Sequence, residues 1–89
     1  MTGYRVKYEK KAIKQLEKID RPERYILRSW IEKNLVGTTN PRQHGKALKG
    51  ELNEYWRYRV GDYRIIAEIN DDEVLILVIE VGHRRDIYR

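Results

Sequence analysis

Residues 54–69 read EYWRYRVGDYRIIAEI, and this stretch decides the fold. Up to Val60, aromatic and apolar side chains alternate with charged ones, which is the pattern of a half-buried strand. Gly61-Asp62 is a short turn of the type that favours a tight hairpin. With this turn, Arg59 lies directly opposite Arg64. The same register pairs Val60 with Tyr63, Tyr58 with Ile65 and Trp56 with Ala67, which gives the hairpin one apolar face.

Another strand is predicted after the hairpin. Residues 70–73 (NDDE) form a polar turn, and the nearly continuous apolar run from Val74 to Val81 is typical of a strand covered on both sides. With the two central aspartates at the tip of the turn, we expect Arg64 opposite Ile79. The chain then leaves this strand at the end of the sheet that carries the arginine pair.

The N-terminal half predicts a strand followed by two helices. Residues from Tyr4 to Tyr8 alternate as a half-buried strand does. Apolar residues then recur at helical spacing at Ala12, Ile13, Leu16 and Ile19. A second helix has Asp20 as its N-cap, Pro22 in its first turn and Gly37 as its terminator. Its apolar stripe is Ile26, Leu27, Trp30, Ile31 and Leu35.

These elements predict an α+β fold of order βααβββ. Residues 38–45 are polar and read as a loop between the helical half and the hairpin. The two helices form a hairpin packed on one face of a small, mainly antiparallel sheet. We expect residues 1–89 to form a single domain, because no stretch is rich enough in Pro, Gly or Ser to be a linker.

Composition narrows the classes of function. The chain has no cysteine, which excludes a disulfide and a thiolate zinc site. Its longest apolar run is far shorter than the roughly 20 residues of a membrane span, so we expect a soluble, cytoplasmic protein without a membrane partner. Lys and Arg number 19 against 14 Asp and Glu, a net charge of +5 that favours a polyanionic partner. Charge alone does not choose between nucleic acid and an acidic protein segment.

Three arginines share the other face of the predicted hairpin. Arg57 and Arg59 are two strand residues apart, about 7 Å, and Arg59 faces Arg64. Like charges directly opposed on two strands are normally destabilising, so we expect a compensating function such as phosphate binding. The alternative is a solvated sheet face, on which alternating charged residues are ordinary.

Two residues near the C-terminus can add proton transfer. RNA cleavage by its own 2′-hydroxyl needs a base, charge stabilisation on the phosphorane and a proton for the leaving 5′-oxygen. Arginine holds its proton too tightly to be a base near neutrality. His83 can serve in either proton step, and Tyr88 can do so if nearby guanidinium groups lower its pKa. The alternatives are an exposed, hydrogen-bonding histidine and a tyrosine that either stacks on a base or anchors the core.

Other candidate sites are weaker. Lys46, Lys49 and Arg42 border the basic face and are candidate phosphate contacts. The consecutive acids Asp71 to Glu73 are ordinary turn residues, and the two histidines lack metal-ligand spacing. We expect no metal and no cofactor.

Several segments together resemble RelE-type toxins of the RelE/ParE superfamily. They are Leu48-Lys49-Gly50, residues 55–59 (YWRYR), residues 61–64 (GDYR) and residues 81–88 (VGHRRDIY). The resemblance covers nearly the whole chain as one RelE-like toxin domain. It implies the toxin of a type II toxin–antitoxin pair, which enters the ribosomal A site, cleaves the mRNA there without metal and inhibits translation. The implied partners are a cognate antitoxin, the ribosome and mRNA.

The resemblance also assigns roles to residues. Arg57 and Arg59 stand where the family often has strand lysines, Arg64 where it has a phosphate-holding arginine, and Arg84 and Tyr88 where it has a terminal pair. Arginine exchanges protons less readily than lysine, so proton transfer falls more heavily on the residues near the C-terminus. The expected catalytic set is Arg57, Arg59, Arg64, His83, Arg84 and Tyr88, with Lys46, Lys49 and Arg85 as further RNA-binding residues.

Two other functions stay open. A ParE-like toxin shares the fold but poisons DNA gyrase through protein contacts, and it has no evident need for arginines beside a proton donor. A noncatalytic basic module would bind RNA or an acidic protein segment, with a salt dependence carried by the arginines. Such a module would be insensitive to substitution of His83 or Tyr88.

Overall fold

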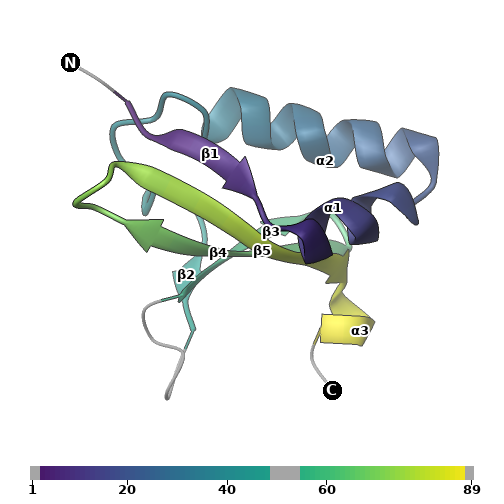
Figure 1. The fold of residues 1–89 in the computed structure, drawn as a ribbon. Coiled ribbons are helices and arrows are strands. Elements are labelled where there is room, and N and C mark those ends of the chain that lie inside the picture. The colour runs from purple at the N-terminus through teal and green to yellow at the C-terminus, as the bar shows by residue number, and fades with distance from the viewer. Residues whose placement is uncertain (1–2, 49–54, 88–89) are drawn as a thin grey trace.

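The computed structural model describes residues 3–48 and 55–87. A five-stranded sheet has the order β1-β5-β4-β3-β2, with β1 parallel to β5 and the other pairs antiparallel. The helices α1 and α2 cover one face, and the short α3 lies on the other side at the end of β5 (Figure 1). The elements are β1 (Arg5–Tyr8), α1 (Lys10–Glu17), α2 (Arg21–Asn34), β2 (Lys46–Ala47), β3 (Tyr55–Val60), β4 (Tyr63–Asn70), β5 (Leu75–His83) and α3 (Arg84–Ile87). The predicted α+β arrangement, with a helical hairpin on one face, is confirmed.

The register of the β3–β4 hairpin is the predicted one. Arg59 pairs with Arg64, and Val60 pairs with Tyr63 across the turn. Gly61 has a φ of 62°, a left-handed conformation that glycine adopts without steric cost. A loop this short leaves the two strands a single register, so the pairing follows directly from the turn.

The predicted register of β4 with β5 is wrong. Arg64 lies opposite Gly82, not opposite Ile79. The turn is wider than expected, because the first pair beyond it is Asn70 with Leu75, and Val74 adopts a left-handed φ of 53°. The register shifts again between Ile66 and Ala67. These two changes extend β5 to His83.

The hydrophobic core lies between the helical hairpin and the sheet. It is formed by Ala12, Leu16, Leu27, Ile31, Leu35, Tyr58, Val60, Ile65, Ala67, Ile76, Val78 and Val81. Two residues expected in the helical stripes stay largely outside it, since Ile13 is 41% exposed and Ile26 is 57% exposed. Asp20 is the N-cap of α2 as predicted, but its side chain makes no capping hydrogen bond. Burial of one helix face therefore holds α2 in place, without a side-chain cap at Asp20.

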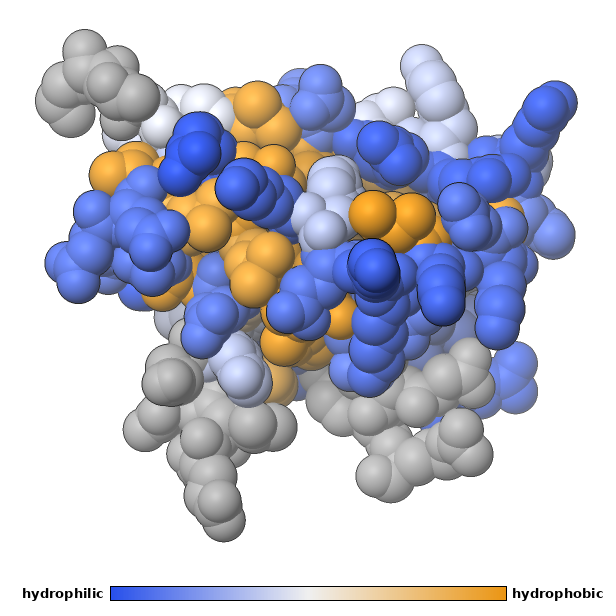
Figure 2. Space-filling model, viewed as in Figure 1, coloured by the Kyte–Doolittle hydropathy of each residue, from blue (hydrophilic) through white to orange (hydrophobic). Residues whose placement is uncertain are grey.

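Polar side chains cover most of the surface over α1, whereas apolar side chains gather over β1 and the adjoining part of β5 (Figure 2). The lysines of α1 and its C-terminal end, Lys10, Lys11, Lys14 and Lys18, are exposed. None of the helices in the described part of the chain is long and apolar enough to cross a membrane.

The loop predicted over residues 38–45 leads into a strand that the sequence pattern did not reveal. β2 has two residues and pairs with β3, with Lys46 opposite Arg57. Gly45 precedes it with a φ of 79°, and a Cβ atom there would collide with the Arg57 carbonyl oxygen. Glycine at this position thus allows β2 to approach β3 closely.

Candidate functional site

Arg57, Arg59 and Arg64 lie on the face of the sheet opposite α1 and α2. Their neighbours Tyr58 and Val60 point into the core, and side chains alternate between the two faces of a strand. The pairing of β3 with β4 sets Arg59 directly across from Arg64. The predicted basic face therefore exists as a cluster of three arginines on two adjacent strands.

The three arginines differ in exposure. Arg59 is exposed and Arg57 is half-buried, whereas Arg64 is only 6% exposed. Ile66, two residues further along β4 on the same face, is 5% exposed. Arg64 donates a long hydrogen bond of 3.5 Å from Nη1 to the Tyr63 carbonyl oxygen. Among the side chains that the structure describes, Arg64 is the one charged group that is buried. Its burial distinguishes Arg64 from the residues of a solvated sheet face.

β2 adds a lysine to this face. Residues directly opposed in an antiparallel pair point to the same side, so Lys46 stands beside Arg57. Lys46 is exposed. Lys46 is one of the predicted phosphate contacts, and the strand that carries it was not predicted. Lys49 lies outside the described residues.

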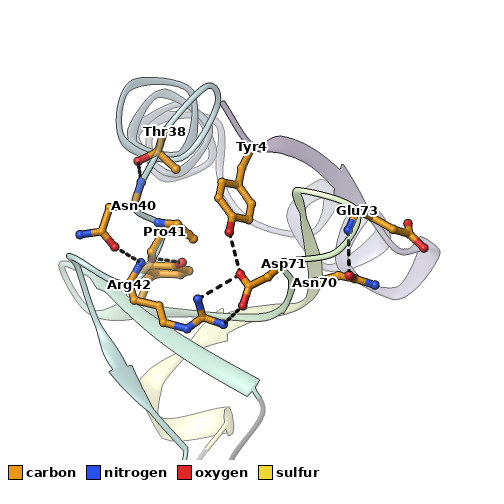
Figure 3. A network of polar contacts seen from close by, with 9 residues as sticks. Tyr4, Thr38, Asn40, Pro41, Arg42, Asn70, Asp71 and Glu73 are labelled. Carbon is orange, nitrogen blue, oxygen red and sulfur yellow. Dashed lines mark hydrogen bonds and ion pairs between the residues drawn. The ribbon is translucent and has the colours of Figure 1, made fainter. Parts of the chain in front are cut away.

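A polar network holds the loop before β2 (Figure 3). Arg42 donates two hydrogen bonds to the Asp71 carboxylate, each 3.1 Å long, and the Tyr4 hydroxyl donates a third at 2.6 Å. The Arg42 guanidinium, followed by the Tyr4 hydroxyl, lowers the pKa of Asp71. Arg42, expected at the border of the basic face, is thus engaged with an acid of the β4–β5 turn.

Two aromatic residues of β3 anchor the same loop from the core side. The buried Tyr58 hydroxyl donates a 2.6 Å hydrogen bond to the Pro41 carbonyl oxygen. The Trp56 indole N–H donates to the His44 carbonyl oxygen. Burial raises the pKa of Tyr58, so its hydroxyl keeps its proton and remains a donor. These two bonds hold Pro41 and His44, and therefore both ends of the segment between them that leads to Lys46.

The structure does not bring the His83 imidazole to the arginine face. Its ring packs edge-on against Tyr63, with 5.5 Å between centroids, and Tyr63 packs against the hydrophobic core under the helices. The His83 Nδ1 atom accepts a 3.3 Å hydrogen bond from the Arg85 backbone N–H. Strand alternation from the buried Val81 would have placed His83 on this helical side.

The remaining predicted site residues begin at Arg84, the first residue of α3. The Arg84 N–H donates a 2.9 Å hydrogen bond to the carbonyl oxygen of Asp62, which ties the start of α3 to the β3–β4 turn. Arg84 and Arg85 are exposed. Tyr88 lies outside the described residues. Within residues 3–48 and 55–87, no three His, Cys, Asp or Glu side chains group in a way that could hold a metal ion.

The sequence profile of the ParE toxins of type II toxin–antitoxin systems (parDE) matches residues 6–88. The chain belongs to this toxin family. Within the RelE/ParE superfamily it is of the RelE type, as its relatives show. Toxin RelG of Mycobacterium tuberculosis (strain ATCC 25618 / H37Rv) is 39% identical over 49 residues, which are 55% of this chain and 56% of RelG. The match thus spans about half the length of that relative.

Solved structures show the same fold along nearly the whole chain. The toxin–antitoxin complex RelBE2 of Mycobacterium tuberculosis contains a chain that matches with a TM-score of 0.84 and 26% identity, over 94% of each chain. A chain of the RelB–RelE antitoxin–toxin complex from Methanococcus jannaschii matches with a TM-score of 0.63 and 30% identity, over 93% of this chain and 95% of that one. The RelE fold is therefore established for this toxin.

Proposed function

We propose that this toxin is an endoribonuclease that cleaves mRNA in the ribosomal A site and so inhibits translation. The observation that carries the proposal is the Arg59–Arg64 pair, in which a buried arginine lies directly opposite an exposed one. Two like charges across a strand pair cost stability. A phosphodiester bound between them offsets that repulsion, because guanidinium groups bind phosphate oxygens through paired hydrogen bonds.

The proposed reaction is attack of the RNA's own 2′-hydroxyl on the adjacent phosphorus. The bond from the 2′-oxygen to phosphorus forms while the bond to the 5′-oxygen breaks, leaving a 2′,3′-cyclic phosphate and a 5′-hydroxyl. A base takes the 2′-hydroxyl proton, and an acid gives a proton to the 5′-oxygen. Arg64, Arg59 and Arg57 stabilise the additional negative charge on the phosphorane, so the reaction needs no metal ion.

Proton transfer is assigned to the C-terminal residues. α3 lies on the side of the sheet away from α1 and α2, which is the arginine side (Figure 1). That placement favours Tyr88, the residue after α3, over His83 as the group that exchanges protons with the RNA. Arg84 completes the proposed catalytic set at the same end of the sheet.

The proposed partners are the ribosome, mRNA and a cognate antitoxin. Lys46, Lys49 and Arg85 are proposed to hold RNA phosphates flanking the cut. The two solved relatives described above are toxin–antitoxin complexes, which supports an antitoxin for this chain. We propose that the antitoxin covers the basic face in the cytoplasm, where it would compete with RNA.

The deciding experiment adds the purified toxin to ribosomes programmed with a defined mRNA, and in parallel to the same mRNA alone. Primer extension maps new 5′ ends in both samples. Cuts confined to the A-site codon of the bound message would support the proposal. Uncut message in both samples, with toxin shown to be folded by circular dichroism, would overturn it.

A second candidate function is poisoning of DNA gyrase. The profile that matches the chain is that of ParE toxins, and this observation favours the alternative. A gyrase poison would inhibit supercoiling of plasmid DNA by purified gyrase. It would keep that inhibition after Arg59→Gln, whereas the ribonuclease would lose cleavage. The supercoiling assay and the primer-extension assay, run on the same two proteins, separate the functions.

A further inference from the structure

A cleft of about 290 Å³ lies between the first half of α2 and the β3–β4 turn. It is on the helical side of the sheet, behind the arginine face. Its walls include Glu23, Ile26, Gly61, Asp62, Tyr63 and His83. The cleft is slightly smaller than the usual range for ligand pockets, about 300–1,000 Å³, and suits a ligand smaller than a drug molecule.

The walls of this cleft suit a flat, uncharged ring. On one side are the two rings of Tyr63 and His83, inclined to each other at 70°. On the other is Ile26, an aliphatic side chain that is 57% exposed although its helix position predicts burial. An aromatic wall facing an aliphatic one can hold a planar heterocycle by stacking and apolar contact.

The charged groups at the cleft are acceptors. Glu23 and Asp62 are exposed carboxylates, and an ionised carboxylate accepts hydrogen bonds but donates none. Two carboxylates repel a phosphate, which has its own binding surface on the arginine face.

The cleft and the arginine face share one turn. Arg59 comes two residues before Gly61, and Arg64 two residues after Asp62. The Arg84 N–H holds the turn through the Asp62 carbonyl oxygen. The backbones of the two arginines are therefore about 7 Å along each strand from the turn residues, a span that a neighbouring nucleotide can cover around the end of the hairpin.

We propose that this cleft binds one nucleobase of the RNA and selects bases that carry an exocyclic amino group. The inference rests on the proposed ribonuclease function. Cytosine, adenine and guanine each present an amino donor to Glu23 or Asp62, as carboxylates accept from the cytosine amino group in DNA complexes. Uracil presents two carbonyl oxygens, which a carboxylate repels, and a single ring N–H.

The test compares cytosine with uracil, because these bases differ mainly in the amino and oxo groups on one ring carbon. Ribosomes carry messages in which each A-site codon position and each flanking position is changed singly from C to U. The ratio of kcat/KM for C and U is measured at each position. We expect a preference for C on the order of tenfold at one position.

Two substitutions remove the acceptor-only character of the two carboxylates. Glu23→Gln and Asp62→Asn keep side-chain length and the backbone carbonyl that receives Arg84, but each offers uracil a donor. We expect one or both to reduce the C-to-U ratio severalfold while cleavage of the C message continues. Asp72→Asn is the matched control, since Asp72 is an exposed turn acid away from the cleft, and it should leave the ratio unchanged.

A binding measurement makes the inference independent of cleavage. In an NMR titration of the full-length toxin with cytidine and uridine monophosphates, CMP should shift the Gly61, Tyr63 and His83 signals more than UMP does. If the wild-type toxin does not cut in the A site, the proposed function is overturned. The titration then still tests whether the cleft binds a nucleobase. Unchanged C-to-U ratios in both variants would overturn the nucleobase site. The same holds if the only effect of the substitutions is weaker binding of the antitoxin.

Discussion

Arg59 and Arg64 face each other across the β3–β4 hairpin, and Arg64 is 6% exposed while Arg59 is exposed. The guanidinium of Arg64 is largely shielded from water, and that of Arg59 is open to a ligand. Such a pair is costly for the isolated fold and useful with a phosphate between its members. The arrangement predicts that stability and activity respond in opposite directions when the exposed member loses its charge.

Arg59→Gln should lower the rate of A-site cleavage on the order of 10²-fold, the loss found when one charge-stabilising donor is removed from an active site. The same change should raise the free energy of unfolding by a few tenths of a kcal/mol, because it relieves repulsion from Arg64. Urea denaturation measures the second effect. The gain should shrink in 1 M salt, where the Debye length is about 3 Å. Arg5→Gln on β1 is the control. Equal effects from both substitutions would contradict the claim that the effects of Arg59→Gln come from its position opposite Arg64.

Gly45→Ala should displace β2 from β3. The added Cβ atom would meet the Arg57 carbonyl oxygen, and φ is 79°. Gly37→Ala is the matched control, because its φ is also 79° but nothing lies within 4 Å of a Cβ there. Gly37→Ala should cost about 1 kcal/mol for the left-handed backbone, and Gly45→Ala distinctly more. Thermal unfolding followed by circular dichroism compares the two, and equal losses would show that the close approach to β3 is unimportant.

Asp71→Asn should destabilise the loop before β2 slightly, by up to about 1 kcal/mol, since the Arg42 pair is exposed. The pKa of Asp71 is lowered in the folded state, chiefly by Arg42. The unfolded chain therefore takes up the proton first as the pH falls, so the stabilisation present at neutral pH is lost at acid pH, below the ordinary aspartate pKa. Urea denaturation at pH 7 and at about pH 2.5 should show a difference between wild type and variant that closes at the lower pH. A difference that persists there would exclude the ionised carboxylate as its cause.

Tyr58→Phe should lower the free energy of unfolding by about 1–2 kcal/mol. The change removes the hydroxyl that donates a hydrogen bond to the carbonyl oxygen of the buried Pro41. The ring still fills its place in the core, so the loss reports the hydrogen bond. Tyr25→Phe is the control, since Tyr25 is 74% exposed on α2. Its free energy of unfolding should stay within about 0.5 kcal/mol of wild type.

The parts of the fold that follow from local rules were predictable. The turn at Gly61-Asp62 allows a single register, and the arginine face follows from that register by alternation. The β4–β5 pairing was not predictable, because the left-handed Val74 widens the turn and a register shift follows Ile66. These features depend on how β5 packs between β4 and β1, which no local pattern encodes.

The missed parts of the site share a related cause. β2 has two residues and α3 has four. These lengths are too short to show the repeat of apolar residues that identifies a strand or a helix. The incorrect register obscured the side of the sheet on which His83 stands, although counting from Val81 would have shown it. The exposure of Ile26, and with it the cleft, depends on where α2 crosses the sheet, which the helical period alone does not specify.

Tyr88→Phe should abolish most A-site cleavage while the toxin still binds programmed ribosomes, because the phenol hydroxyl is the proposed proton-exchanging group. His83→Gln should retain more activity than Tyr88→Phe, since the His83 ring faces Tyr63 on the helical side. Single-turnover cleavage at saturating ribosome gives the chemical rate, and co-sedimentation gives binding. A larger rate loss from His83→Gln than from Tyr88→Phe, at equal binding, would move the proton transfer to histidine. It would also require the end of β5 to rearrange on the ribosome, because the imidazole would then have to reach the arginine face.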